Sequence, residues 1–197
     1  MQWTRAWEGA VTGHAAHNWN GVMRNGSEIA IREAHPSDAP GVQGFVRGLS
    51  RETRRRRFFA PIHELSPEQL QRLTSTPTPD DLNLLVLDCR GEIIGMGQCA
   101  AVDGGEAEFA VVITDDWQRR GIGTTLLRLL LDHARSRHLA SLAGFVLAEN
   151  QAMLGLAAKL GLSLARDADP ALLRVEMAFD DSMTSSRTRL QHSVQPA

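Results

Sequence analysis

The sequence predicts an α+β (mixed α/β) fold around a largely antiparallel sheet, for three reasons. Three consecutive apolar runs in residues 82–114 are separated by short glycine turns, which is typical of an antiparallel meander. Apolar residues at helical spacing occur on both sides of this meander. A strand–helix–strand unit begins at residue 106. Helices and strands therefore mix along the chain, as they do in α+β and mixed α/β domains.

The length and hydrophobic content suit one domain. The chain has 197 residues, of which 43% are hydrophobic, so it can bury a substantial core but is short for two domains. We expect a loosely ordered leader over residues 1–27, whose apolar residues follow neither the helical nor the strand period. We expect the compact domain over 28–180 and a flexible tail, rich in Ser, Thr, Gln and Arg, over 181–197.

The first half of this domain predicts one strand and three helices. Residues 29–34 form the strand. Residues 35–38 supply a turn and a helix cap, after which apolar residues follow at helical spacing. A second helix is expected over 51–59. A third begins at a capping box with proline in the first turn, Ser66-Pro67-Glu68-Gln69, and ends near Leu73.

The second half predicts the meander and then an alternation of helices and strands. The meander strands cover residues 82–89, 92–102 and 106–114. Gly161 is expected to end the last helix, because glycine readily adopts the left-handed conformation of a helix C-cap. After the meander we expect a helix over 121–137, a strand over 142–147, a helix over 150–160 and a strand over 172–179.

Composition and charge exclude several classes of function. The chain contains no tyrosine, so no phenol can act as acid, base or nucleophile. The 21 Lys and Arg nearly balance the 23 Asp and Glu, which leaves no strong field to attract nucleic acid or an anionic membrane. No apolar run approaches the length of a membrane span, and the first residues lack the apolar core of a signal peptide. We therefore expect a cytoplasmic protein with no nucleic-acid or membrane partner.

Three groups of polar residues are expected to have structural roles. Cys89 and Cys99 lack an indicated base and are expected to be buried thiols. No histidine pair has metal spacing with a third ligand, so no metal site is expected. Arg54–Arg57 form the densest basic run, but four consecutive helical residues point in four directions. A mixture of salt-bridged and solvated arginines is favoured over a site for nucleic acid or an acidic substrate.

The most informative stretch, residues 115–127, ends a strand and opens a helix with two glycines. The first-turn amides of a helix have no intrahelical acceptor, and the helix dipole favours negative charge at that end. Glycines let a phosphate approach the backbone, and Arg119 and Arg120 add positive charge. The stretch therefore predicts an anion site.

Two other phosphate-binding motifs fit this stretch less well, and a helix start without a ligand also fits its glycines. A P-loop ends in Gly-Lys-Ser/Thr, whereas residues 123–125 contain no lysine. A dinucleotide-binding fingerprint needs a third glycine, at the position of Leu126, and a parallel sheet. The glycines alone are also compatible with a helix that packs closely and carries solvated arginines.

Two motifs resemble those of a known family. Residues 118–123, Gln-Arg-Arg-Gly-Ile-Gly, resemble the Gln/Arg-x-x-Gly-x-Gly/Ala signature of the GNAT superfamily of acyl-CoA-dependent N-acyltransferases. Residues 149–162 resemble the family's Asn-x-x-(Ala/Met)…Lys-x-Gly-Phe helix, and the order of elements over 28–179 also fits. Leu49–Phe59 is similar to a stretch of the protein-lysine acetyltransferase-like branch. The resemblance implies a GNAT-like fold, with helices on both faces of a twisted, mostly antiparallel sheet, and acetyl-CoA-dependent N-acetyltransferase activity.

The resemblance also implies where acetyl-CoA binds. The pantetheine arm would pair with the strand before the signature, which splays away from the strand at 142–147. Asn150 matches a position that often hydrogen-bonds the arm. The arm would contact the backbone of Val111, Val112 and Ile113, and the pyrophosphate would lie on the amides of Gln118, Arg119, Arg120, Gly121, Ile122, Gly123 and Thr124.

Attack of an amine on the thioester needs a base, because a lysine amine with a pKa of about 10.4 is mostly protonated at neutral pH. Glu106 and Glu108 share one strand face, since they are two residues apart. By the resemblance, Glu108 stands at the position of the glutamate that serves as the base in the protein-acetylating branch. Glu106 is the second candidate. Both could instead be ordinary solvated carboxylates. A backbone N–H near residues 111–113 could stabilise the oxyanion.

The sequence departs from the family at one position. Many members use a tyrosine, seven residues after the motif asparagine, to protonate the departing thiolate, and Ala157 stands there. No general acid is assigned, so the thiolate either leaves without a proton donor or takes its proton from water. The acceptor amine could be a small molecule or a protein lysine, and the protein a monomer or homodimer. The alternative is a catalytically weak acyl-CoA-binding regulatory module.

Overall fold

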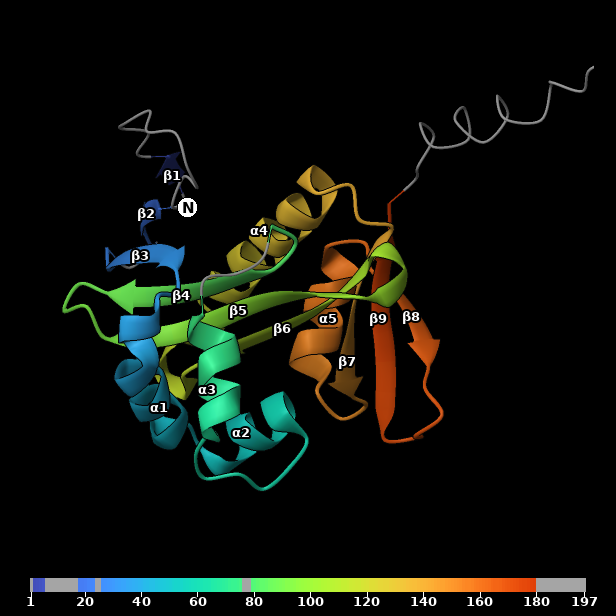
Figure 1. Ribbon diagram of the computed structural model, residues 1–197, viewed down its shortest axis with the longest axis horizontal. Helices are drawn as coiled ribbons and strands as arrows, with labels where there is room; N and C mark the ends of the chain where they lie inside the picture. Colours follow the sequence, from blue (N-terminus) through green and yellow to red (C-terminus); the bar gives the residue numbers. More distant parts are fainter. Residues whose placement is uncertain (1, 6–17, 24–25, 76–78, 180–197) are drawn as a thin grey trace, which may run out of the picture.

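One mixed sheet runs through the part of the chain that the computed structural model describes, which is residues 2–5, 18–23, 26–75 and 79–179. Its nine strands have the order β1-β2-β3-β4-β5-β6-β7-β9-β8 (Figure 1). Neighbouring strands are antiparallel except β6 and β7, which are parallel. The strands are β1 (Gln2–Arg5), β2 (Asn18–Val22), β3 (Glu28–Glu33), β4 (Leu82–Asp88), β5 (Ile93–Val102), β6 (Glu106–Ile113), β7 (Ser141–Leu147), β8 (Ser163–Arg166) and β9 (Leu172–Ala178).

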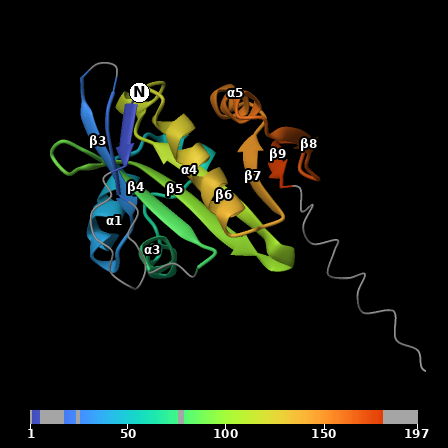
Figure 2. The same ribbon diagram turned by 90° about the horizontal axis from the view of Figure 1, so that it is seen from above.

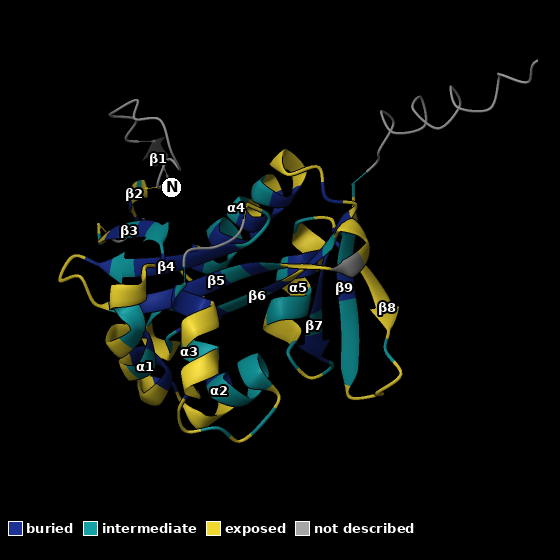
Figure 3. Cartoon of the chain, viewed as in Figure 1, coloured by how far each residue is buried: buried dark blue, intermediate teal, exposed yellow. Residues whose placement is uncertain are grey.

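Helices cover both faces of the sheet. Seen from above, α4 and α5 lie on one face, and α1 and α3 lie on the other (Figure 2). The larger apolar cluster joins the sheet to α4 and α5, and the smaller one joins it to α1 and α3. Buried residues accordingly concentrate in the central strands and the inward helix faces (Figure 3). The helices are α1 (Ala39–Gly48), α2 (Arg51–Phe58), α3 (Pro67–Thr74), α4 (Ile122–Ser136) and α5 (Gln151–Lys159).

Local signals in the sequence explain where the helices begin. The predicted capping box of α3 is present, because the Ser66 hydroxyl accepts from the backbone of Gln69 and the Gln69 side chain accepts from that of Ser66. Asn150 caps α5 in the same way, by accepting from Met153 N–H. The α+β class, the mostly antiparallel sheet and the helices on both faces are confirmed.

Two strands occur where the sequence analysis expected a loosely ordered leader. β2 pairs with the whole of β3, from Asn18 opposite Arg32 to Val22 opposite Glu28, and β1 pairs with β2. The expectation is therefore wrong for residues 2–5 and 18–22. The apolar alternation of this segment is weak. Pairing with the edge of β3 supplies the stabilisation of strand structure that the local sequence lacks. Residues 6–17 of the expected leader and the expected tail lie outside the described residues.

Two further expectations need correction. β8 was not predicted, because all its residues are exposed and it carries no apolar alternation. Cys99 is buried, as expected, and burial raises the pKa of its thiol to about 12. Cys89 lies just after β4 and is exposed rather than buried. Exposure follows from the turn after Asp88, where the chain leaves the sheet.

The sheet opens between β6 and β7. Eight residues of β6 pair with β5, but only the first three, Glu106 to Glu108, pair with β7. Beyond Glu108 the two strands diverge. The ring of Phe109 fills the base of this opening against Gly144 of β7, where a Cβ atom would lie 2.8 Å from the ring carbons. Glycine is required at this position because the ring already occupies the space of a side chain.

Hydrogen bonds attach α2 to the loop that follows β6. The Asp115 carboxylate accepts from the backbone N–H and hydroxyl of Ser50 and from the Thr53 hydroxyl, the last at 2.8 Å. Gln118 Nε2 donates to Thr53 Oγ1 and to the carbonyl of Ile113. Partial burial raises the pKa of Asp115, but the hydrogen bonds from Thr53 and Ser50 outweigh it and the net pKa lies below its usual value.

Replacement of Gly144 tests the close approach to Phe109. Gly144→Ala is expected to lower the free energy of unfolding by about 1–3 kcal/mol, because the added Cβ must displace the ring or the strand. Gly155→Ala in α5 is the matched control, since a Cβ there meets nothing within 4 Å and alanine favours a helix. Urea unfolding monitored by circular dichroism measures both. Equal stabilities of Gly144→Ala and the wild type would contradict the close packing of the Phe109 ring against Gly144.

Replacement of Asp115 tests the attachment of α2. Asp115→Ala is expected to lower the free energy of unfolding by about 1 kcal/mol at neutral pH, since Ser50 and Thr53 lose their shared acceptor. Because the pKa is lowered in the folded state, this contribution is present above the unfolded pKa, about 3.9, and is lost as the pH falls below it. Denaturation at several pH values measures the loss. The exposed neighbour variant Asp116→Ala should show no comparable effect.

Candidate active site

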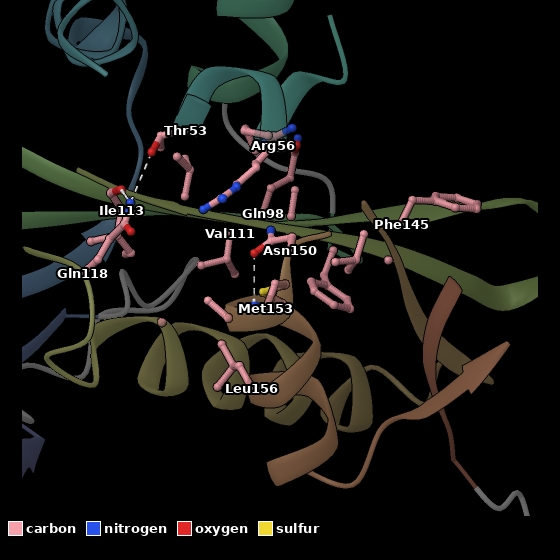
Figure 4. Close-up of a pocket in the computed structure, with 18 of the residues that line it drawn as sticks. Thr53, Arg56, Gln98, Val111, Ile113, Gln118, Phe145, Asn150, Met153 and Leu156 are labelled. Carbon is pink, nitrogen blue, oxygen red and sulfur yellow. Dashed lines mark hydrogen bonds between the residues drawn. The ribbon is translucent and has the colours of Figure 1, made fainter. Parts of the chain in front are cut away.

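A pocket of about 460 Å³ occupies the opening between β6 and β7. Its size is typical of small-molecule sites. Figure 4 shows Thr53 and Arg56, from α2, on one side of the sheet, and Met153 and Leu156, from α5, on the other. Val111 of β6 lies between these two walls. The pocket therefore passes through the sheet at the point where two strands separate.

Most of the predicted donor-binding residues line this pocket, but two do not. Arg120 is not a lining residue, and its guanidinium stacks over the ring of Trp117, which does line the pocket, at 5.0 Å. The side chain of Ile122 is 1% exposed and belongs to the core under α4. The predicted residues that line the pocket are Val111, Val112, Ile113, Gln118, Arg119, Gly121, Gly123, Thr124 and Asn150.

The loop before α4 has the backbone geometry of an anion site. Gly121, the N-cap residue, has φ +91° and Arg119 has φ +59°, so the chain bends twice through the left-handed region. Such bends turn successive amides toward one concave side. No side chain caps the N-terminus of α4, which leaves its first-turn amides and its dipole facing the pocket mouth. Arg119 is exposed there and adds a positive charge.

The central part of the pocket offers backbone and amide groups. Beyond Glu108, the side of β6 that faces β7 has no strand partner. The carbonyl of Ile113 is an exception, because it accepts from Gln118 Nε2 at 3.1 Å. Asn150 uses Oδ1 to cap α5, at 3.2 Å from Met153 N, so its Nδ2 donor is the group left for a ligand. An extended polar chain can therefore pair along β6 in the opening.

The two predicted carboxylates, Glu106 and Glu108, have different surroundings in the structure. Glu108 is the last residue of β6 that pairs with β7, and its side chain is exposed and lines the pocket. It forms no ion pair with a described residue. Glu106 does not line the pocket, and Arg174 of β9 lies 3.2 Å from its carboxylate. Arg174 also binds Glu176 at 3.1 Å. The free carboxylate at the pocket is therefore that of Glu108.

The basic run of α2 is a wall of the pocket, which periodicity alone did not indicate. Arg54 donates to three backbone carbonyls at the end of α1. Arg55 pairs with Glu52 and Glu149, and Arg56 also pairs with Glu52. The expected mixture of salt-bridged and solvated arginines holds only in part, since Arg56 and Arg57 line the pocket. The pocket residues that the sequence analysis did not select include Thr53, Phe59, Gln98 and Ala100.

The departure at Ala157 has a structural counterpart. Ala157 is fully buried in the core beneath α5 and does not line the pocket, whereas its neighbours Met153 and Leu156 do. Among the described lining residues there is no Cys, His or Lys, and Glu108 is the carboxylate. The chemistry available from side chains is thus that of one carboxylate and several guanidinium groups.

The described residues contain neither a metal-binding cluster nor a membrane-spanning helix. No group of three or more His, Cys, Asp or Glu within that part of the chain is arranged to hold a metal ion. None of its helices is both long and apolar enough to cross a membrane.

Comparisons with known proteins agree with this geometry. The model of the acetyltransferase (GNAT) family matches residues 49–162. An acetyltransferase of Pseudomonas aeruginosa is 31% identical over 156 residues, which cover 77% of this chain and 84% of that protein. The L-methionine sulfoximine/L-methionine sulfone acetyltransferase of the same species is 30% identical over 145 residues, or 69% and 81% of the two chains.

A solved structure shares both the fold and part of the sequence. The GNAT domain of PAT from S. lividans superposes with a TM-score of 0.75 and 27% identity, over 81% of this chain and 96% of that one. The matched family segment runs from the end of α1 to the residue before β8, and it contains the opening between β6 and β7 with the loop before α4. The chain therefore belongs to the GNAT family of acetyltransferases.

Proposed function

We propose that this protein transfers the acetyl group of acetyl-CoA to a primary amine, with Glu108 as the general base. The observation that carries the proposal is the position of Glu108. Its unpaired carboxylate lies where β6 and β7 part, beside the pocket and next to the backbone that would hold the thioester. A base within reach of both the donor and an incoming amine is what the reaction needs.

The reaction consumes one amine and one thioester. The ammonium form of the acceptor gives a proton to the Glu108 carboxylate, and the neutral nitrogen attacks the carbonyl carbon. A backbone N–H of residues 111–113 stabilises the oxyanion. The carbon–sulfur bond then breaks, and CoA leaves as a thiolate that takes a proton from water, since the described pocket lining holds no Cys, His or Lys and the chain has no tyrosine. The nitrogen of the new amide loses its extra proton to solvent, and Glu108 returns the proton it accepted to solvent, which regenerates the base.

Acetyl-CoA would be held along the opening. The amides of residues 118–124 would bind the pyrophosphate, supported by the bends at Arg119 and Gly121 and by the free end of α4. The pantetheine arm would pair with the unpartnered side of β6 at Val111 to Ile113, and Asn150 Nδ2 would donate to it. The side chains of Arg120 and Ile122 would take no part, although the amides of both residues remain available.

The acceptor is either a small amine or a protein lysine. A small acceptor is supported by the related enzyme named for L-methionine sulfoximine and L-methionine sulfone. A lysine is supported by the resemblance of Leu49–Phe59, which forms the pocket wall on α2. The proposal assigns the activity to residues 28–180. It also assumes a monomer or homodimer in the cytoplasm that acts without a metal, nucleic acid or membrane.

The second candidate is a regulatory module that binds acyl-CoA and turns it over poorly. The burial of Ala157, where many relatives place a tyrosine, favours it, since no acid assists the leaving thiolate. This candidate shares the donor site and differs in the role of Glu108.

Binding of acetyl-CoA is the first test. Acetyl-CoA is expected to raise the melting temperature, because a ligand at a hundredfold excess over its Kd stabilises the folded state by about 2.7 kcal/mol. Arg119→Glu should weaken the apparent affinity about tenfold by placing a negative charge beside the phosphates. Arg128→Glu, an exposed change on α4 outside the pocket, is the matched control. An unchanged melting temperature with acetyl-CoA would contradict the donor site.

Release of free CoA thiol tests the base. Glu108→Gln is expected to lower the rate with an amine or lysine-peptide acceptor by about 10²- to 10⁴-fold and to retain the stabilisation by acetyl-CoA. Glu106→Gln makes the same change outside the pocket, where the carboxylate is paired with Arg174, and should have a small effect. Equal rates for Glu108→Gln and the wild type would refute the assignment. Binding without thiol release for any acceptor would favour the regulatory module.

A further inference from the structure

One guanidinium of α2 has surroundings unlike those of its neighbours. Arg54, Arg55 and Arg56 each meet carbonyl or carboxylate oxygens. Arg57 lines the pocket, and its hydrogen-bond acceptor among the described residues is the neutral amide oxygen of Gln98, 3.2 Å from Nη2. No carboxylate of the described chain lies within ion-pairing distance of it. Arg57 is therefore a pocket cation without an anionic partner.

The Arg57 side chain is partly buried, which makes the lack of an anionic partner unfavourable. The Arg57 guanidinium packs 4.9 Å from the centre of the Phe58 ring, and burial lowers its pKa to about 10, so that it still carries its charge at neutral pH. A buried charge is unfavourable unless an opposite charge or several hydrogen bonds compensate it. Guanidinium carries five N–H donors in a planar fork that matches a carboxylate. One neutral acceptor leaves most of these donors for a ligand.

The strand register places this cation on the same face as the proposed base. Gln98 lies opposite Ala110, and Ala100 lies opposite Glu108, so Gln98 and Glu108 stand two residues apart on neighbouring strands and face the same side. Arg57 contacts Gln98 from α2 and shares the pocket with Glu108. The α2 side of the pocket therefore presents a carboxylate and a guanidinium together.

We propose that Arg57 binds a carboxylate of the acetyl acceptor, so that the acceptor is an amino acid rather than a simple alkylamine. Its ammonium group faces Glu108 while its carboxylate pairs with the Arg57 fork, which complements both charges of a zwitterion. Gln98 is a positioning residue, because it touches the guanidinium and fixes its orientation. The inference rests on the proposed function, since it concerns the amine that Glu108 deprotonates.

Binding of matched pairs tests the proposal without turnover. Each common L-amino acid and L-methionine sulfone is compared with its own carboxamide by calorimetry, on the full chain saturated with CoA. The wild type is expected to bind the best amino acid at least about tenfold more tightly than its carboxamide, the effect of losing hydrogen bonds to a charged group. Arg57→Gln should bind the two forms about equally, and Arg57→Lys, which keeps the charge without the fork, should be intermediate.

Arg51→Gln is the matched control, because it removes the same charge from an exposed position of α2 outside the pocket and should keep the preference. Stabilisation by acetyl-CoA, measured for every variant, separates this proposal from the proposed function. Its absence in the wild type means that the donor site itself is wrong.

Any of four outcomes overturns the proposal. In the first, the wild type binds no amino acid of the panel more tightly than its carboxamide. In the second, Arg57→Gln keeps the preference. In the third, Arg57→Gln loses the stabilisation by acetyl-CoA, which would assign the guanidinium to a phosphate of the donor. A lysine peptide with no free carboxylate that binds as tightly as the best amino acid would contradict it as well.

Discussion

The pairing of β6 with β7 over only three residues is the constraint on which the site depends. A parallel pair that continued to Ile113 would satisfy the backbone groups of β6 and close the sheet. Because it stops at Glu108, β6 exposes an unpaired edge inside the molecule, where most edges are found at the outside. Phe109 and Gly144 keep the strands apart at the base of the opening, since the ring occupies the space that a side chain on β7 would need.

The two faces of the sheet contribute different groups to the opening. On the α4 side, backbone amides and an uncapped helix end form the proposed anion site, which needs no particular side chain. On the α2 side, side chains carry the chemistry, with Glu108 and Arg57 as unpaired opposite charges. Asp115, Thr53 and Gln118 connect the two sides, because their hydrogen bonds join α2 to the loop before α4.

Much of the fold could be predicted because its signals are local. The capping box at Ser66, the glycine turns of the meander and the apolar period of α4 each depend on a few neighbouring residues, and each element appears within about two residues of its expected bounds. β2 and β8 could not be predicted, because they form by pairing with β3 and β9 and carry little apolar alternation of their own. For these two strands the pairing with a neighbouring strand decides the structure, and the local sequence does not.

The site divides in the same way. The sequence alone predicted an anion-binding loop, from its glycines and its place before a helix, and narrowed the candidates for the proposed base to two glutamates on one strand face. Only the tertiary structure distinguished them, because Arg174, distant in the sequence, neutralises Glu106 and leaves Glu108 at the opening. It also decided which arginine of α2 lacks an anionic partner. The pairs of Arg55 and Arg56 with Glu52 follow from helical spacing within α2. The contacts of Arg54 with α1, of Arg55 with Glu149 and of Arg57 with Gln98 are set by the packing of α2, and a local pattern cannot specify such long-range partners.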